Sequence, residues 1–331
     1  MARRILIAGG TGLTGTQVAR QLRATDAGVE IVLAARTPER GEALARELGN
    51  AHTARLDLTD GTGLDAVAGA DLVVAALYDP AGALLHAALA AGAGHIGITT
   101  KAEDVAPAAF AALGGAPSRP IVLLGHSMAG VATMVALRAA RRFRRISKVE
   151  VTALFDPRDP VGPMTGGDAE GLIARALLRR DGAWSWVHGV ASGRAVVLAD
   201  GSELPAYPTG LLDVPSLAAI TGAPDVRVDI AAGDSLGTRG GDAPSSDVLI
   251  DLEGVLETGE PGRRRTILSD PKGLMHLTAL GVATAAERVL GLDGRPPAAG
   301  GLYLPETLLD ADAAIARFER TGVRILAEGA A

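Results

Sequence analysis

Short apolar runs alternate with amphipathic segments through the first 130 residues of the chain. The runs are predicted as strands, and they lie at residues 5–8, 30–35, 52–56, 71–77, 95–99 and 120–125. Segments with helical spacing or helix-start signals lie between them, at 14–25, 37–48, 61–68, 80–91 and 107–113. This repeated strand–helix order predicts an α/β fold of the Rossmann type, with a doubly wound parallel sheet.

The pattern changes after the basic run 141–145, which is interpreted as a solvated helix end. A helix is expected from Asp168 to about Arg179, and others at 131–141, 273–290 and 310–321. Predicted strands at 148–155, 194–198, 226–231, 247–257 and 263–268 follow one another with few helices between them. They predict a second, α+β domain with a mostly antiparallel sheet. The expected domains are 1–128, 129–272 for substrate or dimer contacts, and 273–331, which returns to the first.

The turn after the first strand carries the clearest chemical signal. Its sequence, AGGTGLTG at residues 8–15, joins a buried strand to a helix N-terminus. The spacing of Gly10, Gly12 and Gly15 fits a dinucleotide-binding fingerprint: one glycine permits the turn, one admits a pyrophosphate and one lets the helix pack on the strand. The helix N-terminus would attract the phosphates. The expected cofactor-binding residues here are Gly9, Gly10, Thr11, Gly12, Leu13, Thr14 and Gly15.

The second strand ends in Arg36, where an NAD-specific site would place an acidic residue about 20 residues past the glycines. An arginine there can pair with a 2′-phosphate, so NADP is the expected cofactor; alternatively Arg36 is a solvated charge. Asp57 is a candidate for the adenine amino group or a turn carboxylate. Further cofactor contacts are expected at Leu58, Ala76 and Leu77, because ligands lie at the carboxyl ends of parallel strands.

The same edge of the predicted sheet carries the candidates for catalysis. Tyr78 follows the fourth strand, Lys101 the fifth and His126 the sixth. Lys101 or His126 could act as a general acid, although a solvated lysine and a turn histidine are the alternatives. Substrate contacts are expected from Asp79, Thr99, Ser127, Gly166 and Asp168. Trp184, Trp186 and His188 are further candidates for a substrate pocket, or core and interface residues.

Residues 121–130, IVLLGHSMAG, present a competing motif. A strand, a turn and a helix surround Ser127 as in the nucleophile elbow of serine hydrolases. Ala129 replaces the last glycine of that motif, and no HGGG-type oxyanion loop precedes it. The alternative interpretation is that Gly125 and Gly130 turn the chain out of the first domain.

Composition narrows the function classes. The 331 residues include no cysteine, which excludes disulfides and thiolate chemistry. The formal net charge of −6 disfavours nucleic acid as a partner. No segment is long and apolar enough for a membrane span, and the first strand leaves no room for a signal peptide, so a cytoplasmic location is expected. The histidines lack metal-ligand spacing, so no metal is expected.

Several of these motifs together resemble the saccharopine dehydrogenase-like family of NAD(P)-binding oxidoreductases. The likeness rests on AGGTGLTG (8–15), LAAR (33–36), residues 55–82 and 84–100, and more loosely on MTGGDAEG (164–171), SDPKG (269–273), GLYLPE (301–306) and RTGVRI (320–325). It implies a dinucleotide domain interrupted by a second domain, redox chemistry at a C=N or C=O bond, and a homodimer. Gly97 and Asp168 depart from the family pattern, which leaves the substrate open.

Three functions follow. The first is an NADP-dependent oxidoreductase acting on a small metabolite. The second is a non-catalytic NADP-binding sensor, since the glycine turn also resembles that of NmrA-like regulators and there is no Tyr-x-x-x-Lys pair. The third is a serine hydrolase that uses Ser127.

Overall fold

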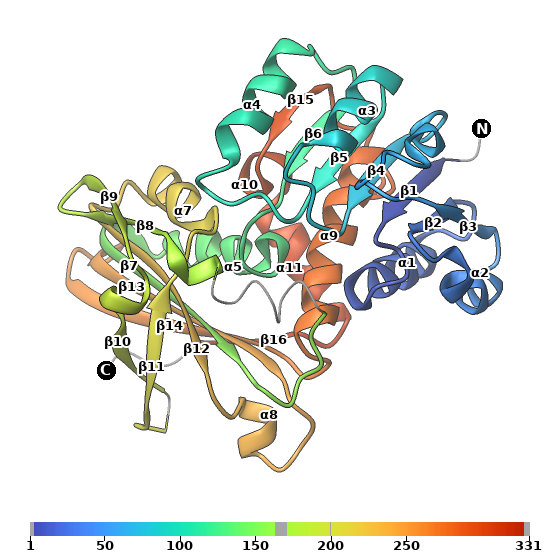
Figure 1. Ribbon diagram of the computed structural model, residues 1–331. Helices are drawn as coiled ribbons and strands as arrows, with labels where there is room; N and C mark the ends of the chain where they lie inside the picture. Colours follow the sequence, from blue (N-terminus) through green and yellow to red (C-terminus); the bar gives the residue numbers. More distant parts are fainter. Residues whose placement is uncertain (1–2, 163–170, 199, 328–331) are drawn as a thin grey trace. The chain divides into compact units, whose positions relative to one another are not determined.

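The structure is a computed structural model that describes residues 3–162, 171–198 and 200–327 (Figure 1). The chain divides into two compact units. One holds the described residues of Met1–Gly125 together with Thr278–Leu309, and the other those of His126–Leu277 together with Asp310–Ala331. None of the described helices is long and apolar enough to span a membrane.

The first unit is built on a seven-stranded parallel sheet in the order β15-β6-β5-β4-β1-β2-β3. Its strands are β1 (Arg4–Ala8), β2 (Glu30–Ala35), β3 (Ala51–Arg55), β4 (Leu72–Ala75), β5 (Gly94–Gly97), β6 (Pro120–Leu123) and β15 (Gly301–Tyr303). The order reverses between β1 and β4, so the predicted doubly wound parallel sheet is confirmed. Only the short β15 was not expected in it.

The helices of the first unit connect these strands. They are α1 (Leu13–Thr25), α2 (Glu42–Leu48), α3 (Ala83–Ala91), α4 (Val105–Gly114) and α10 (Pro305–Leu308), with the 3-10 turns η1 (Pro38–Gly41) and η2 (Leu64–Val67). Right-handed crossovers place α1 and α2 on one face of the sheet and α3 and α4 on the other, as Figure 1 shows. The helix expected at 61–68 is only the short η2.

The second unit contains a nine-stranded mixed sheet with the path β10-β11-β12-β7-β13-β14-β16, to which β8 and β9 attach through β12. The strands are β7 (Phe143–Phe155), β8 (Ala176–Arg180), β9 (Ala183–Val187), β10 (Arg194–Val197), β11 (Glu203–Pro208), β12 (Asp225–Ala232), β13 (Ser246–Leu256), β14 (Pro261–Asp270) and β16 (Arg324–Ala327). Among the described strands of this sheet, only β7 and β12 pair in parallel, so the predicted mostly antiparallel sheet is confirmed.

Alternation along β7 and β13 gives this sheet two different faces. Val149, Val151, Val248 and Ile250 are buried on the face against which α5 and α7 pack. The other face carries charged residues, among them Lys148 and Glu150. The helices of this unit are η3 (Ser127–Gly130), α5 (Val131–Ala140), η4 (Val190–Ser192), α7 (Asp213–Thr221), α8 (Leu236–Arg239) and α11 (Ala311–Arg320), and α9 (Leu274–Leu290) begins in it.

Three segments differ from the sequence-based expectation. The expected helix ending near Arg179 is wrong over Ala176–Arg180, which form β8 in a hairpin with β9. The turn Asp181–Gly182 has φ of 49° and 79°, the left-handed values of a tight hairpin turn. The basic run 141–145 is not a helix end over its whole length, because α5 ends at Ala140 and β7 begins at Phe143. Residues from Asp310 onward join the second unit, since β16 pairs with β14.

Candidate active site

Gly10, Gly12 and Gly15, in the turn between β1 and α1, each have a different structural role. An ideal Cβ on Gly10 would lie 2.9 Å from the Ile7 carbonyl oxygen, so the turn itself requires a glycine there. A Cβ on Gly15 would lie 2.3 Å from the Gly9 oxygen, so close packing of α1 requires the third. Gly12 has one neighbour within 4 Å, the Gly9 oxygen at 3.2 Å. Its backbone is therefore the one that a ligand can approach.

Gly9 adds a fourth constraint to this turn. Its φ of 80° is left-handed, and a Cβ on it would lie 2.6 Å from the Ala76 carbonyl oxygen at the end of β4. The Ala76 amide in turn donates to the Ala8 oxygen at 2.9 Å. The backbones of β1 and β4 are thus joined directly at the edge where the cofactor contacts of Ala76 and Leu77 were expected.

The first turn of α1 is electrostatically open to an anion. Gly12 is its N-cap, no side chain among the described residues caps it, and its first turn holds no acidic residue. Gly12 and Leu13 are exposed, while Thr11 and Thr14 are half-buried. A helix N-terminus with backbone donors and no carboxylate attracts phosphate.

Two cations follow β2. Arg36 is exposed and has no acidic partner within the described part of the chain. Arg40, on η1, is also exposed and equally lacks one. The sequence reasoning overlooked Arg40, although the spacing Arg-Thr-Pro-Glu-Arg after a strand end offers the signal. Both side chains remain available to an added anion.

The residues after β3 and β4 are partly engaged by their own backbone. Asp57 Oδ1 accepts a hydrogen bond of 3.0 Å from the Thr59 amide, as a turn carboxylate does, and Leu58 packs on the core. Asp79 accepts from the amides of Ala83 and Leu84 at 3.0 and 2.8 Å. Its carboxylate therefore binds the N-terminus of α3, which limits its use for a substrate.

Tyr78, Thr99 and Lys101 belong to the neighbouring ends of β4 and β5. Tyr78 is 47% exposed and Lys101 is half-buried. The Thr99 hydroxyl donates to the Leu77 carbonyl oxygen at 3.2 Å and ties the two strand ends together. Because β4 and β5 are parallel neighbours, these side chains share one edge of the sheet.

His126 and Ser127 belong to the second unit and are both buried. His126 Nε2 lies 2.8 Å from the Ser216 hydroxyl, and burial lowers the pKa of its imidazole to about 3. The ring is therefore neutral near pH 7 and holds no proton to donate as an imidazolium.

The Ser127 hydroxyl and amide both donate to one oxygen of the Asp213 carboxylate, at 3.1 and 2.7 Å. Thr133 donates to the other oxygen at 3.2 Å. Burial raises the pKa of Asp213 to about 6, although these hydrogen bonds oppose the rise. In a nucleophile elbow the serine oxygen is exposed on a strained residue. Here Ser127 is buried, and the left-handed residues are Met128 and Ala129 instead.

Sequence reasoning missed the partners of this second turn. Asp213 and Ser216 lie on α7, which was not predicted, so nothing adjacent in sequence identified them. A buried pair at the end of β14 was also missed: His276 Nδ1 lies 2.6 Å from Asp270 Oδ2. The SDPKG motif that contains Asp270 was noticed only as a family likeness.

The remaining site residues fall into two groups. Gly166 and Asp168 lie outside the described residues. Trp184 and Trp186, on β9, are largely exposed, and the guanidinium groups of Arg179 and Arg175 stack on their rings at 5.4 and 4.5 Å. Within residues 3–162, 171–198 and 200–327, no three His, Asp or Glu side chains gather to hold a metal ion.

The sequence matches no protein-family model and no curated protein. Among solved structures, the chain resembles saccharopine dehydrogenase (L-Glu forming) from Saccharomyces cerevisiae, with a TM-score of 0.72, 13% identity, and 99% and 100% of the two chains covered. Scyllo-inositol dehydrogenase from Lactobacillus casei matches with a TM-score of 0.50, 13% identity and 98% of each chain covered. The expected likeness to saccharopine dehydrogenase is thus confirmed at the level of the fold.

Proposed function

We propose that the protein is an NADP-dependent oxidoreductase that acts on a C=N or C=O bond of a small metabolite. The observation that carries this proposal is the β1–α1 turn, where Gly10 and Gly15 are required by packing and Gly12 is left open beside an uncapped helix N-terminus. This is the division of roles that a pyrophosphate site needs. The cofactor would be held by residues 9–15, with further contacts from Ala76, Leu77 and Asp57.

The preference for NADP over NAD rests on charge. Arg36 and Arg40 are exposed cations without acidic partners in the described residues, and no carboxylate ends β2. A 2′-phosphate would form charge-assisted hydrogen bonds with a guanidinium, which are about twice as strong as neutral ones. A ribose 2′-hydroxyl would gain little from the same side chains.

A bound nicotinamide ring supplies or accepts the hydride. The chain must then orient the substrate and move one proton. His126 is a poor donor because its pKa is about 3, so Tyr78 and Lys101 are the stronger candidates at the β4–β5 edge. Lys101 follows Thr99 by two residues, and the hydrogen bond from Thr99 to Leu77 fixes this edge.

The alternative is a non-catalytic NADP-binding sensor. It is favoured by one observation: the side chains of Asp79 and Thr99, two of the expected substrate contacts, form hydrogen bonds with the backbone. A serine hydrolase is disfavoured by the bond from Ser127 to Asp213. A homodimer in the cytoplasm remains part of the proposal for the oxidoreductase.

Calorimetric titration of NADPH and NADH into the wild type and Arg36→Gln tests cofactor choice. The wild type should prefer NADPH, and the variant should lose about tenfold to a hundredfold in NADPH affinity with NADH affinity unchanged. Arg46→Gln is the matched control, because Arg46 is an exposed arginine on α2. Equal affinity of wild type and Arg36→Gln for NADPH would refute the assignment of Arg36.

Turnover separates the enzyme from the sensor. NADPH oxidation should be measured with ketones and aldehydes, alone and with amines that form imines. For an enzyme, Lys101→Met should lower kcat about a hundredfold or more while the Kd for NADPH stays constant. Tight NADPH binding with no oxidation for any carbonyl or imine would favour the sensor.

A further inference from the structure

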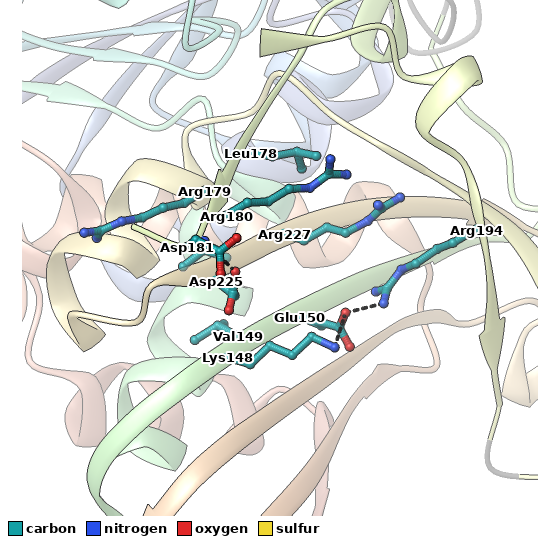
Figure 2. A pocket seen from close by; sticks show the side chains of 11 residues that line it. Lys148, Val149, Glu150, Leu178, Arg179, Arg180, Asp181, Arg194, Asp225 and Arg227 are labelled. Atoms are coloured by element: carbon teal, nitrogen blue, oxygen red, sulfur yellow. Dashed lines mark hydrogen bonds and ion pairs between the residues drawn. The ribbon is translucent and has the colours of Figure 1, made fainter. Parts of the chain in front are cut away.

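A cavity of about 280 Å³ lies in the second unit, on the charged face of its sheet (Figure 2). Its walls come from β7, β8, β10 and β12 and from the turn that follows β8. None of its lining residues belongs to the unit that carries the glycine turn. The proposed cofactor contacts therefore lie outside this cavity.

Two guanidinium groups in the cavity are held rigidly by one buried carboxylate. Arg194 Nε donates to Asp229 Oδ2 at 2.9 Å, and Arg227 Nε donates to Asp229 Oδ1 at 2.7 Å. Asp229 is fully buried. Arg227 also donates to the Ser192 carbonyl oxygen at 2.7 Å, and Arg194 pairs with Glu150. These bonds fix the orientation of both arginines before any ligand arrives.

Arg180 brings a third guanidinium to the same place. Val226 of β12 aligns with Arg179 of β8, so the side chain of Arg180, the next residue, points to the charged face with Arg227. Figure 2 shows it extending toward Arg227. Burial lowers the pKa of Arg227, and the charges of Arg194 and Arg180 lower it further, as expected of neighbouring cations.

The charges at this end of the cavity do not balance. Glu150 and Asp229 are shared by Lys148, Arg194 and Arg227, with Lys148 Nζ at 3.0 Å from Glu150. Arg180 has no carboxylate partner among the residues that the structure describes. Four cations therefore meet two carboxylates, and two of the cations, Arg194 and Arg227, are held in fixed positions.

Two further carboxylates limit the size of the ligand. Asp225 accepts a hydrogen bond of 2.9 Å from the Asp181 amide, and Figure 2 shows both aspartates on the side of the cavity away from Arg194. A long polyanion would have to pass these negative charges. A compact anion can occupy the arginine side alone.

We propose that this cavity is a binding site for a small oxyanion, a phosphate or carboxylate group, held among Arg180, Arg194 and Arg227. Planar guanidinium groups bind such oxygens in pairs of parallel hydrogen bonds, and preorganised donors lose little entropy on binding. Arg180 supplies the charge that the protein itself leaves uncompensated.

Calorimetry with inorganic phosphate and with succinate, in a buffer free of other oxyanions, tests this site and distinguishes a phosphate ligand from a carboxylate ligand. We expect saturable binding of at least one of them. Arg180→Gln should weaken that binding about tenfold, equivalent to about 1.4 kcal/mol. Arg144→Gln is the matched control, since Arg144 is an exposed arginine of β7 outside the cavity.

Asp181→Asn provides a test in the opposite direction. Asparagine tolerates the left-handed backbone at this position, and the loss of one negative charge should tighten oxyanion binding about threefold. NADPH affinity should be the same in all these variants, which distinguishes this site from the proposed cofactor site. The proposal is refuted if neither anion binds in the millimolar range, or if Arg180→Gln binds as the wild type does.

Discussion

The turn after β1 and the turn after β6 share a sequence pattern, an apolar strand followed by glycines and then a helix. In the first, the N-terminus of α1 has no side-chain cap and no acidic residue in its first turn. In the second, the Asp213 carboxylate accepts the amide and hydroxyl of Ser127 and the hydroxyl of Thr133. One turn keeps donors for a ligand, and the other uses them within the protein.

The exposure of the two turns differs in the same sense. Gly12 is exposed in the first turn, whereas Ser127, Met128 and Ala129 are buried in the second. A helix N-terminus is an anion site only when the surrounding structure has not already filled it. The comparison therefore predicts ligand-binding defects from changes in the first turn and stability defects from changes in the second.

The largest effect is expected for Gly15→Ala. A methyl group 2.3 Å from the Gly9 oxygen and 2.8 Å from the Gly10 Cα meets backbone on both sides. Destabilisation by roughly 3 kcal/mol or more is expected from such overpacking, with loss of nucleotide binding. Urea denaturation measures it. Gly114→Ala is the control, because Gly114 ends α4 with nothing within 4 Å of its Cβ position, and it should change stability little.

Asp213→Asn tests the second turn through its pH dependence. The pKa of Asp213 is raised to about 6 by burial, so the folded wild type holds a proton that the unfolded chain releases near pH 4. Asp213 therefore stabilises the wild type at low pH, and this contribution of on the order of 3 kcal/mol to the unfolding free energy is lost as the pH rises from about 4 to 6. The unfolding free energy of Asp213→Asn relative to wild type should rise over that range. A difference that does not change with pH would contradict the assignment.

His95 on β5 gives the first unit a pH dependence of opposite sign. It is 6% exposed, both ring nitrogens lack hydrogen-bond partners among the described residues, and burial lowers its pKa to about 4. Stability from this group is present above pH 6.5 and is lost as pH falls toward 4. The unfolding free energy of His95→Leu relative to that of the wild type should therefore rise by about 2 kcal/mol as the pH falls from 7.5 to 5. Denaturation curves of both proteins at the two pH values measure this gain.

Ser127→Ala is expected to have the smallest effect. The Asp213 carboxylate keeps its bonds from the Ser127 amide and from Thr133, so only one hydrogen bond is lost. A loss of about 1 kcal/mol in unfolding free energy is typical of such a change. A fluorophosphonate should not label the wild type at Ser127, and stoichiometric labelling there would support the serine hydrolase instead.

The parallel sheet was predictable from sequence because the residues that indicate each of its strands lie within or next to that strand. Each of the six predicted strands is a short run with a glycine or proline within three residues of one end, and Pro38 marks the start of η1, which leads into α2. The glycine turn was predictable for the same reason, since its strand, turn and helix are contiguous and its spacing reflects backbone clearance.

The misread parts depend on distant partners. The sequence predicts a helix to about Arg179, over the residues that form β8, because alternation over five residues is ambiguous; Asp181–Gly182 is the turn signal that indicates a hairpin instead. The sequence makes His126 a candidate acid, but its ring is buried against Ser216, 90 residues away along the chain. No local pattern indicates that Asp213 will accept the bonds of Ser127, 86 residues earlier.

The most direct test is calorimetric titration of NADPH into three proteins: wild type, Gly12→Ala and Ser127→Ala. Gly12 has a φ of −81° that alanine adopts freely, and its Cβ would have one close neighbour, so the fold should survive. We expect Gly12→Ala to bind NADPH at least tenfold more weakly than the wild type, and Ser127→Ala to bind it equally well. Unchanged binding in Gly12→Ala, or loss of binding in Ser127→Ala alone, would contradict this expectation.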